Sequence, residues 1–521
     1  MRWNLLLVML IPALVAAAPS TEGLNDPDLL ARWRQLLEDH VPDRGWSSRL
    51  RATGLGGREG VRFYSRWGVS SDGLEASVVT ERDPGERHLD DHLVGYLQWQ
   101  HSKGRLVLGD LRAGFSQGLV FGRGSGRGRG RPRRDSHALG LRSSAENRAI
   151  RGAAASLGRG QWLVVVLAGQ LRRDARFDEA GNVRSLPEDG LHTRPTALAG
   201  EVALSGQVAG LRLRWQREDR HVGLVLQHLC FGQRLRLSSR YGRPVFVGRS
   251  QASGAIDGGW FAGRRQFYGQ LARTPSSWSF VGGFVDRRRN RLRWSGQVRS
   301  YGPRFFSPLG SADRRWKTWN ERGVVIDLRG SRWRTWAEIS QRPRPASIPV
   351  SDDSAEAGFE RTWRVSPGQL RLDLRQRYDL DWRQHARYRG TQRIRLAGTR
   401  SSGLHRWRIQ WHNSLSDCER GMALGLEGRR KGPVGQTNLQ FTLFRIPSWS
   451  SRIYEYESTL PGAVSIRPLS GTGWRLNAAL GHRSGPWMLA AFGRHERRQH
   501  LPARSVFGVQ IDHLGADTQV R

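Results

Sequence analysis

The sequence predicts an all-β protein: a large antiparallel transmembrane β-barrel of roughly 20 to 24 strands, with an even strand number. Three observations lead to this prediction. The chain starts with an export signal, it contains no second apolar stretch long enough for a transmembrane helix, and apolar and charged residues alternate along most of its 521 residues. A short N-terminal helix and a loop or plug in the lumen complete the expected fold.

Residues 1–17 are predicted to be a signal peptide. The chain begins with Met1-Arg2, continues with the apolar run Leu5–Val15 and then reaches the small residues Ala16–Ala18. Basic, apolar and small residues in this order are typical of a secretory signal, and the run is too short to span a bilayer as a helix. A buried strand or helix start is the alternative. We expect cleavage after Ala17 and export from the cytoplasm.

Residues 18–58 are predicted to be a short periplasmic helical segment. Asp26 or Asp28 can cap a helix that runs to about Asp39 with its apolar residues on one face. No later apolar stretch reaches the roughly 18 residues that a transmembrane helix needs, and the longest one is Trp162–Leu171. The exported chain is therefore either soluble or a barrel, because only helices and closed barrels satisfy their backbone in lipid.

Residues 59–521 are predicted to form the barrel, because their apolar and charged residues alternate. The clearest case is Gln369–Arg383, and the same pattern recurs in residues 211–215, 291–300, 406–411 and 474–477. Successive side chains of a strand point to opposite faces, so each segment has one apolar and one charged face. In Gln369–Arg383 the apolar parity holds Leu370, Leu372, Leu374, Tyr378, Leu380 and Trp382, and the charged parity holds Arg371, Asp373, Arg375, Arg377, Asp379, Asp381 and Arg383.

A soluble β-sandwich could also use such strands, but two features favour the membrane barrel. The segments recur about every 10 to 20 residues with turns between them, for example at Ser366-Pro367-Gly368. Aromatic residues also lie near segment ends, where an interfacial girdle is expected. These residues are Trp316, Trp319, Trp333, Trp336, Trp363, Trp382, Trp449 and Tyr454.

The chain is strongly basic. Lys and Arg number 84 against 46 Asp and Glu, which gives a formal net charge of +38. Many arginines occupy the charged parity of the predicted strands, so we expect an Arg-rich lumen that attracts anions, since a low-dielectric wall focuses the field of its charges. High genomic GC content explains part of the arginine excess. Nucleic acid, lipopolysaccharide phosphates and small anions are the partners consistent with the imbalance.

The segment Gly122–Arg134, GRGSGRGRGRPRR, is a dense basic stretch. Alternating Gly and Arg gives a flexible cationic chain that can track phosphates, and the spacing matches neither a dinucleotide fingerprint nor a P-loop. We expect residues 121–160 to be a loop or plug in the lumen, with a nucleic-acid-binding arm as the compatible alternative. The candidate polyanion-binding residues are Arg123, Arg127, Arg129, Arg131, Arg133 and Arg134.

No catalytic residue, metal site or cofactor is expected. The 15 His residues are scattered, and Cys230 and Cys418 lie far apart without a disulfide or metal-binding spacing. Asp90-Asp91-His92 is the nearest approach to a catalytic group. Adjacent strand residues point opposite ways, so a solvated loop is the favoured interpretation of this tripeptide. The chain is therefore not expected to be an enzyme.

Two sequence elements, Thr80–Glu86 (TERDPGE) and Val107–Leu119 (VLGDLRAGFSQGL), are followed later by residues 453–462 (IYEYESTLPG) and 471–474 (GTGW). In this order they resemble a family of Gram-negative outer-membrane barrel proteins usually described as helix-hairpin-helix domain-containing. Leu111 and Ser116 depart from the usual aromatic residue and glycine. The matching residues are Arg82, Asp83, Gly85, Glu86, Gly109, Asp110, Phe115, Gln117, Gly118 and Leu119.

The resemblance implies an outer-membrane location in a Gram-negative bacterium, with membrane lipid and the barrel-assembly machinery as partners. It also implies a link to DNA through a helix-hairpin-helix region, which this chain lacks in clear form. We expect Gly109, Gly114 and Gly118 to bend the chain so that the Arg/Gly segment turns into the barrel mouth. We further expect Asp110 and Glu86 to pair with lumen arginines.

The leading expectation is an outer-membrane pore or transport protein with an anion-attracting lumen. The alternative is a polyanion-binding component that takes up DNA at the outer membrane. The chain ends at Gln519-Val520-Arg521, without the terminal aromatic residue that barrel assembly usually favours. An atypical last strand or a shortened reading frame is therefore expected.

Overall fold

The structure is a computed structural model of the whole chain. It describes residues 45–55, 60–84, 92–123, 130–133, 135, 137–142, 147, 149–187, 200, 203–239, 242–287, 292–315, 319–343, 352–380, 388–416, 419–432, 435–463 and 465–513. The expected signal peptide, the expected helix near residues 26–39, Gly85, Glu86 and Cys418 lie outside these residues. In the described part of the chain, no helix has the length and apolar character needed to cross a bilayer.

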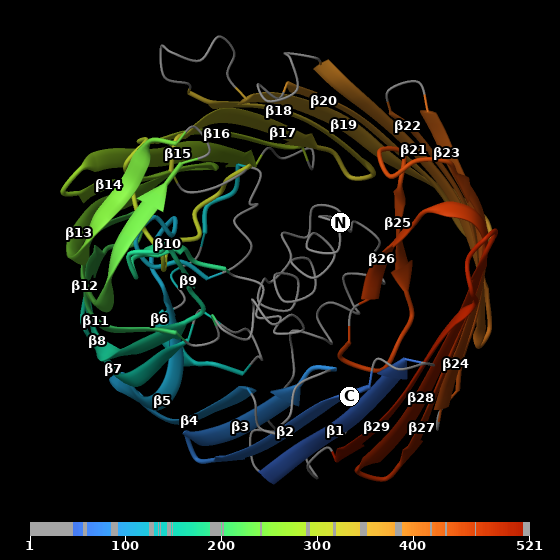
Figure 1. Cartoon of the computed structure of the whole chain (residues 1–521), viewed down its shortest axis with the longest axis horizontal. Helices are drawn as coiled ribbons and strands as arrows, with labels where there is room; N and C mark the ends of the chain where they lie inside the picture. Colours follow the sequence, from blue (N-terminus) through green and yellow to red (C-terminus); the bar gives the residue numbers. More distant parts are fainter. Residues whose placement is uncertain are drawn as a thin grey trace.

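The strands close into one barrel, seen nearly end-on in Figure 1. The main sheet has 27 strands; β6, β9 and β10 are short, and the other 24 form a closed antiparallel barrel. The last barrel strand returns to the first, in a register that runs from Ser48 opposite His513 to Leu55 opposite Val506. The predicted all-β barrel with an even number of strands is confirmed.

The barrel strands follow one another in chain order. They are β1 (Gly45–Leu55), β2 (Val61–Ser71), β3 (Leu74–Arg82), β4 (His92–His101), β5 (Gly104–Gly114), β7 (Ile150–Arg159), β8 (Trp162–Arg173), β11 (Leu204–Gln216), β12 (Arg220–Ser238), β13 (Pro244–Ala262), β14 (Arg265–Thr274), β15 (Ser277–Arg287), β16 (Arg293–Tyr301), β17 (Glu321–Arg329), β18 (Trp333–Arg342), β19 (Asp352–Val365), β20 (Gly368–Leu380), β21 (Tyr388–Ser402), β22 (His405–Ser416), β23 (Glu419–Lys431), β24 (Gly435–Ile446), β27 (Gly471–Ser484), β28 (Trp487–Arg498) and β29 (Arg504–His513). The remaining strands are β6 (His137–Gly140), β9 (Arg176–Phe177), β10 (Val183–Ser185), β25 (Ile453–Glu457) and β26 (Ser465–Leu469).

Two expected boundaries are corrected. The barrel begins with β1, so it starts before residue 59 and takes in residues that we assigned to the periplasmic segment. The alternation in β1 is weak because its outward positions include Ser48, Ala52 and Gly54, which are not strongly apolar. The Arg/Gly-rich loop also ends before residue 160, because Ile150 already starts β7.

The barrel is apolar outside and polar inside. On β24, Leu439 and Leu443 point outward and are 55% and 48% exposed, whereas Gln440 and Thr442 point inward and are 3% and 1% exposed. The same alternation holds in β20, where Leu370 is outward and Asp373 is buried on the inner face. A water-soluble protein buries its apolar face, so this arrangement is the reverse of a soluble sandwich and suits lipid around the wall.

The two ends of the barrel differ in the length of their connections. One end has only short turns, such as 72–73, 102–103 and 160–161, and β1 begins and β29 ends there. The other end carries four long connections, residues 115–149, 174–203, 302–320 and 447–470. We call these the short-turn end and the long-loop end.

Exposed tryptophans gather near the short-turn end, as an interfacial girdle requires. They include Trp46, Trp67, Trp99, Trp162, Trp260, Trp407 and Trp487.

The expected girdle was partly wrong. Trp333 and Trp363 do lie on the outward parity near the short-turn end. Trp336 instead points inward, 1% exposed, because it packs over Gly358 and carries the guanidinium of Arg334 4.8 Å from its ring centroid. Among the other expected members, Trp449 and Tyr454 lie in the connection between β24 and β27, Trp319 packs against the apolar core in the lumen, and Trp316 and Trp382 lie outside the described residues.

Candidate functional site: the barrel lumen

Three segments from the long-loop end occupy the lumen. We call the described residues of 115–142 the first inner loop, residues 302–315 the second inner loop, and strands β25 and β26 the inner hairpin. Figure 1 shows β6, β25 and β26 inside the ring of barrel strands. Of the expected loop or plug at residues 121–160, the described residues up to 142 belong to the first inner loop, whereas residues 150–159 form β7 of the wall.

An apolar core fixes the first two loops to one side of the wall. The aromatic rings of Phe115 and Phe121 lie 5.4 Å apart in an edge-on pair, and Phe306 stacks on Phe246 at 4.8 Å. This core is the largest apolar area of the inner face; smaller ones lie where Phe444 and Phe492 pack against the segment 447–470. The wall members of the largest core include Val165, Leu167, Leu171, Val208, Val225, Leu229, Ala255, Ala272 and Val281.

Backbone hydrogen bonds hold the two loops to each other and to the wall. The Ser311 amide donates to the Gly118 carbonyl at 2.9 Å, and the Gly122 amide donates to the Leu309 carbonyl at 2.9 Å. The Leu119 amide donates to Oε1 of Gln270 on β14 at 3.0 Å. Gly118 has a φ of +83°, which favours glycine. Gly118, one of the three glycines expected to bend the chain, therefore lies where the chain turns into the lumen, and Gln270 holds Leu119 there.

The other motif residues also have structural contacts. Asp110 accepts two hydrogen bonds from Arg151, at 3.0 and 2.9 Å, and one from the Gly95 amide at 2.9 Å. We expected Asp110 to pair with an arginine of the lumen. Its partner is an arginine, but Asp110 and Arg151 share the outward parity with Leu108, so the expected location of the pair is wrong. Asp83 forms an ion pair with Arg62 at 2.5 Å, and Gln117 accepts a hydrogen bond from the Arg133 amide at 3.2 Å. Arg82 is half-buried.

Replacing Gly109 by Val is expected to destabilise the barrel by about 1 to 3 kcal/mol. Gly109 has a φ of +100°, and an added Cβ would overlap the Gly95 carbonyl and lie 2.9 Å from Tyr96 Cα. The measurement is the fraction of refolded protein that migrates as the compact band in unheated gels. Gly160→Ala is the matched control, since its φ is also positive (+59°) but nothing lies within 4 Å. Equal losses in both variants would contradict the role of the close approach.

The candidate polyanion-binding residues are only partly described. Arg127, Arg129 and Arg134 lie outside the described residues, and Arg123, Arg131 and Arg133 are half-buried. Nη1 of Arg133 donates to the Arg123 carbonyl at 3.4 Å. Burial, assisted by the nearby guanidinium groups of Arg142 and Arg105, lowers the pKa of Arg123 to about 10, so it stays protonated at neutral pH.

One carboxylate anchors the first inner loop to the wall. Asp135 accepts hydrogen bonds from Arg212 at 2.8 Å, from Arg214 at 3.2 Å and from the Ser116 amide. Arg212 also donates to Asp257 on β13 and is 1% exposed. Burial alone would raise the pKa of Asp135, but Arg212, Ser116 and Arg214 together lower it below its usual value.

The inner hairpin is fixed to the opposite side of the wall by Glu457. Its carboxylate accepts hydrogen bonds from Arg475 on β27 at 2.6 Å, from Arg494 on β28 at 3.0 Å and from Ser465 at 2.8 Å. All three charged side chains are at most 3% exposed. Burial would raise the pKa of Glu457, but the neighbouring arginines, Arg475 and Arg494 first, lower it.

Glu455 makes different contacts on the same strand. It accepts hydrogen bonds from Gln410 at 3.0 Å and from Thr442 at 2.7 Å, both neutral side chains of the wall. Burial therefore raises the pKa of Glu455 above its ordinary value. In the inner hairpin, the arginine partners of Glu457 therefore stabilise its ionised form, whereas burial destabilises the ionised form of Glu455.

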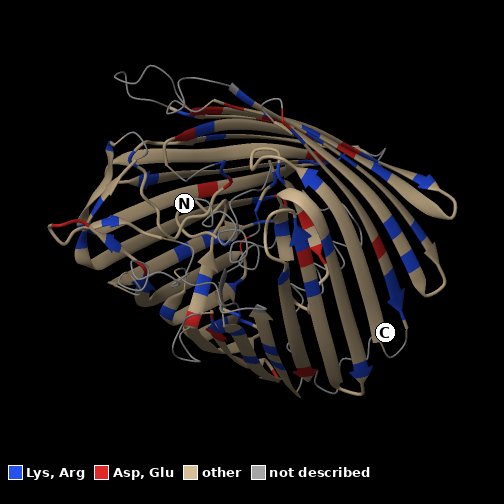
Figure 2. Ribbon diagram, turned by 45° about the vertical axis from the view of Figure 1, so that its right-hand side comes forward, with Lys and Arg blue, Asp and Glu red and all other residues tan. Residues whose placement is uncertain are grey.

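Many lumen arginines are neutralised, which corrects the simple expectation of an open cationic lumen. Arg299 on β16 contacts Glu321 at 2.7 Å and Glu338 at 2.6 Å. Arg375 on β20 contacts Asp373 at 3.0 Å. Figure 2 shows acidic residues placed among the basic ones along the strands. The net charge of the chain therefore overstates the field inside the barrel.

Basic residues also gather on β21 and the neighbouring inner hairpin connection; we call Arg393, Arg395 and Arg452 the cationic strip, in which Arg395 lies opposite Asp373 of β20. Arg393 lies directly across from Arg375, and the charges of Arg377 and Arg452 act on it as well. Arg395 donates to Gln410 at 3.0 Å, which places this parity on the lumen side. Like charges opposite each other on a sheet are destabilising, and Asp373 and Glu360, which pair with Arg375, offset part of this cost.

Sequence reasoning missed Asp135, Glu455, Glu457 and the cationic strip. Glu455 and Glu457 lie in the IYEYESTLPG element, so the family resemblance marked them without a role. In the described part of the chain, no group of three or more His, Cys, Asp or Glu residues could hold a metal ion. Cys230 is an exposed free thiol.

Comparisons with known proteins show similarity at the level of the barrel. No family model matches the chain, and no curated protein matches it. A solved structure of the P pilus usher PapC translocation pore is 13% identical, with a TM-score of 0.39 over 90% of this chain and 98% of that chain. An E. coli P pilus tip assembly intermediate, PapC-PapD-PapK-PapG, is 11% identical, with a TM-score of 0.47 over 91% of this chain and 61% of that chain. Pseudomonas aeruginosa OccK5 (OpdH) is 10% identical, with a TM-score of 0.32 over 90% and 97%.

Proposed function

We propose that this protein is an outer-membrane channel for anionic solutes, with a lumen narrowed by its inner loops and inner hairpin. The observation that carries the proposal is the reversed burial of the wall, with leucines such as Leu439 exposed and Gln440 and Thr442 buried on the inner face. A closed barrel with a lipid-facing apolar wall and a polar interior is the arrangement by which strands cross a membrane.

The two barrel ends support an orientation. Bacterial outer-membrane barrels have short periplasmic turns and longer extracellular loops. The short-turn end, where residues 72–73 and 160–161 lie, is therefore assigned to the periplasm, and the long-loop end to the cell exterior. The inner loops and the inner hairpin then enter the lumen from the outside.

The cationic strip supports anions as the solutes. Arg393 and Arg395 point into the lumen from β21, and Arg452 lies on the connection that leads to the inner hairpin. A basic strip between low-dielectric walls raises the local concentration of anions and lowers that of cations. The proposal includes no catalytic step, cofactor or metal ion.

The double variant Arg393→Gln/Arg395→Gln is expected to reduce the anion-to-cation permeability ratio about threefold or more, because it removes two charges from the lumen wall. The measurement is the reversal potential of single channels in planar bilayers under a salt gradient. Arg322→Gln on the outward face of β17 is the matched control and should leave the ratio unchanged. A protein that inserts but never conducts, or that prefers cations, would contradict the proposal.

The DNA alternative is tested in the same bilayers. Arg123 and Arg133 are half-buried in the first inner loop, and the Arg133 guanidinium donates to the Arg123 carbonyl. This burial and this hydrogen bond favour a structural role for the described part of the Arg/Gly segment. Short DNA that blocks the wild-type channel at low salt, but not the cationic-strip variant, would extend the solute class to polyanions.

A further inference from the structure

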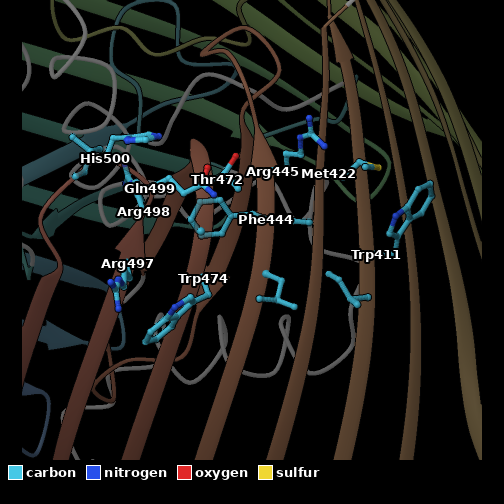
Figure 3. Close-up of a pocket in the computed structure, with 15 residues that line it drawn as sticks. Trp411, Met422, Phe444, Arg445, Thr472, Trp474, Arg497, Arg498, Gln499 and His500 are labelled. Carbon is cyan, nitrogen blue, oxygen red and sulfur yellow. The ribbon is translucent and has the colours of Figure 1, made fainter.

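The outer face of the barrel carries a groove that anion passage does not use. It lies on β22, β23, β24, β27 and β28 at the long-loop end and has a volume of about 910 Å³ (Figure 3). One row of residues in direct cross-strand register runs along it. In order across the strands, the row is Trp411, Leu424, Leu443, Trp474 and Arg497.

This row is apolar from β22 to β27 and ends on a guanidinium group. Trp411 and Trp474 stand on either side of the two leucines, so the smaller side chains form a hollow between two indoles. Leu424 and Leu443 are among the exposed apolar residues of the wall. Flat aromatic sides and a leucine floor fit acyl chains better than they fit water.

The next row toward the long-loop end is more polar, although Met422 of β23 belongs to it. It contains Arg445 opposite Thr472, and the Gln499 amide donates to the Thr472 carbonyl at 2.8 Å. His500, in the connection between β28 and β29, also lines the groove. The groove therefore crosses the line where the apolar wall gives way to polar residues.

The charge of the groove has one sign. None of the side chains that line it is acidic. Arg445 and Arg497 are exposed, and neither makes an ion pair or hydrogen bond within the described part of the chain. They stand two strands apart, which is roughly 10 Å across the sheet. Arginine at such a site can bind a phosphate through two parallel hydrogen bonds.

We propose that this groove binds lipopolysaccharide of the outer leaflet, with acyl chains on the Trp411–Trp474 row and phosphates at Arg445 and Arg497. The proposal rests on the orientation argued under the proposed function, which places the long-loop end at the cell exterior. A lipid with two phosphates on a rigid sugar headgroup engages both arginines. A phospholipid with a single phosphate engages one.

The test uses the full chain refolded in non-ionic detergent. The readout is the temperature at which the compact band is lost in gels, measured against added lipopolysaccharide, dephosphorylated lipopolysaccharide and phosphatidylglycerol. Lipopolysaccharide is expected to raise this temperature in a saturable way. Arg445→Gln/Arg497→Gln is expected to weaken the apparent affinity about tenfold or more, since two charge-assisted contacts are lost.

The matched control is Arg273→Gln/Arg322→Gln, which removes two outward arginines from the same end on β14 and β17. It should bind lipopolysaccharide like the wild type. Equal stabilisation by phosphatidylglycerol, equal stabilisation by the dephosphorylated lipid, or an unchanged affinity of the groove variant would each overturn the proposal. A groove variant that changes the oligomeric state while lipid has no effect would assign the groove to a second copy of the chain instead.

This result is separable from the channel proposal. Binding is measured in detergent and needs no conductance, whereas reversal potentials are measured without lipopolysaccharide. The variant Arg445→Gln/Arg497→Gln lies outside the lumen, so its ion selectivity should equal that of the wild type. A channel that fails to conduct but binds lipopolysaccharide would reject the channel alone.

Discussion

Glu457→Gln is expected to release the inner hairpin and to raise the single-channel conductance. The substitution keeps the size of the side chain but leaves Arg475 and Arg494 without the carboxylate that bridges them at 2.6 and 3.0 Å. Breaking a buried ion pair by removing one partner costs about 3 to 5 kcal/mol. In the described part of the chain, β25 and β26 share backbone strand pairing with each other and with no barrel strand, so this loss acts on the docking of the hairpin rather than on the barrel wall.

Glu455→Gln is the matched control for this prediction. Its oxygen can still accept the hydrogen bonds from Gln410 and Thr442, and the change removes a buried charge that has neutral partners. Conductance should therefore stay at the wild-type level, and the hairpin should be as resistant to protease or more so. Equal conductance changes in the two glutamate variants would contradict the assignment of Glu457 as the anchor.

Glu457 and Glu455 also predict how the single-channel conductance changes with pH. The pKa of Glu457 is lowered, so its contribution is complete above the ordinary glutamate value, about 4.3, and is lost as pH falls through the lowered pKa. The pKa of Glu455 is raised, so its penalty disappears first on acidification. Conductance should thus remain at its neutral-pH level under mild acid and increase only below the ordinary glutamate range.

The barrel could be predicted because alternation is a local property of the chain. Gln369–Arg383 shows it without any knowledge of neighbouring strands, and β20 has the predicted faces. Trp336 shows where the inference fails. Its place near a segment end suggested the girdle, but its partner Gly358, on the next strand, leaves room for an inward indole. That room is visible only once the register is known.

The site was less predictable than the wall for the same reason. Asp135 and Arg212 are far apart in the sequence, and nothing local marks their contact. The Arg/Gly segment drew attention through its composition, whereas the cationic strip depends on Arg393 standing opposite Arg375. Composition counts charges, but only the register shows which charges have counterions.

Asp135→Asn is expected to loosen the first inner loop by about 2 to 4 kcal/mol, because the carboxylate accepts charge-assisted bonds from Arg212 and Arg214. Trypsin cleavage at the half-buried Arg133 should then become about tenfold faster or more, since protease attack follows the population of the opened loop. Asp178→Asn is the control, because the partners of Asp178 lie within its own turn, at Ala180 and Asn182.

The apolar core makes this prediction a test of how the lumen is closed. If Phe115 and Phe121 alone held the loop, cleavage of Asp135→Asn would match the wild type, and the buried charges would contribute only to the wall. If the carboxylate is needed, the wild type should also lose protection in acid, below the ordinary aspartate pKa of about 3.9, because the pKa of Asp135 is lowered and its contribution is lost as pH falls through that value. Protection in the variant, measured in acid with an acid-active protease instead of trypsin, should then be low and independent of pH over the same range, which separates charge from packing in one titration.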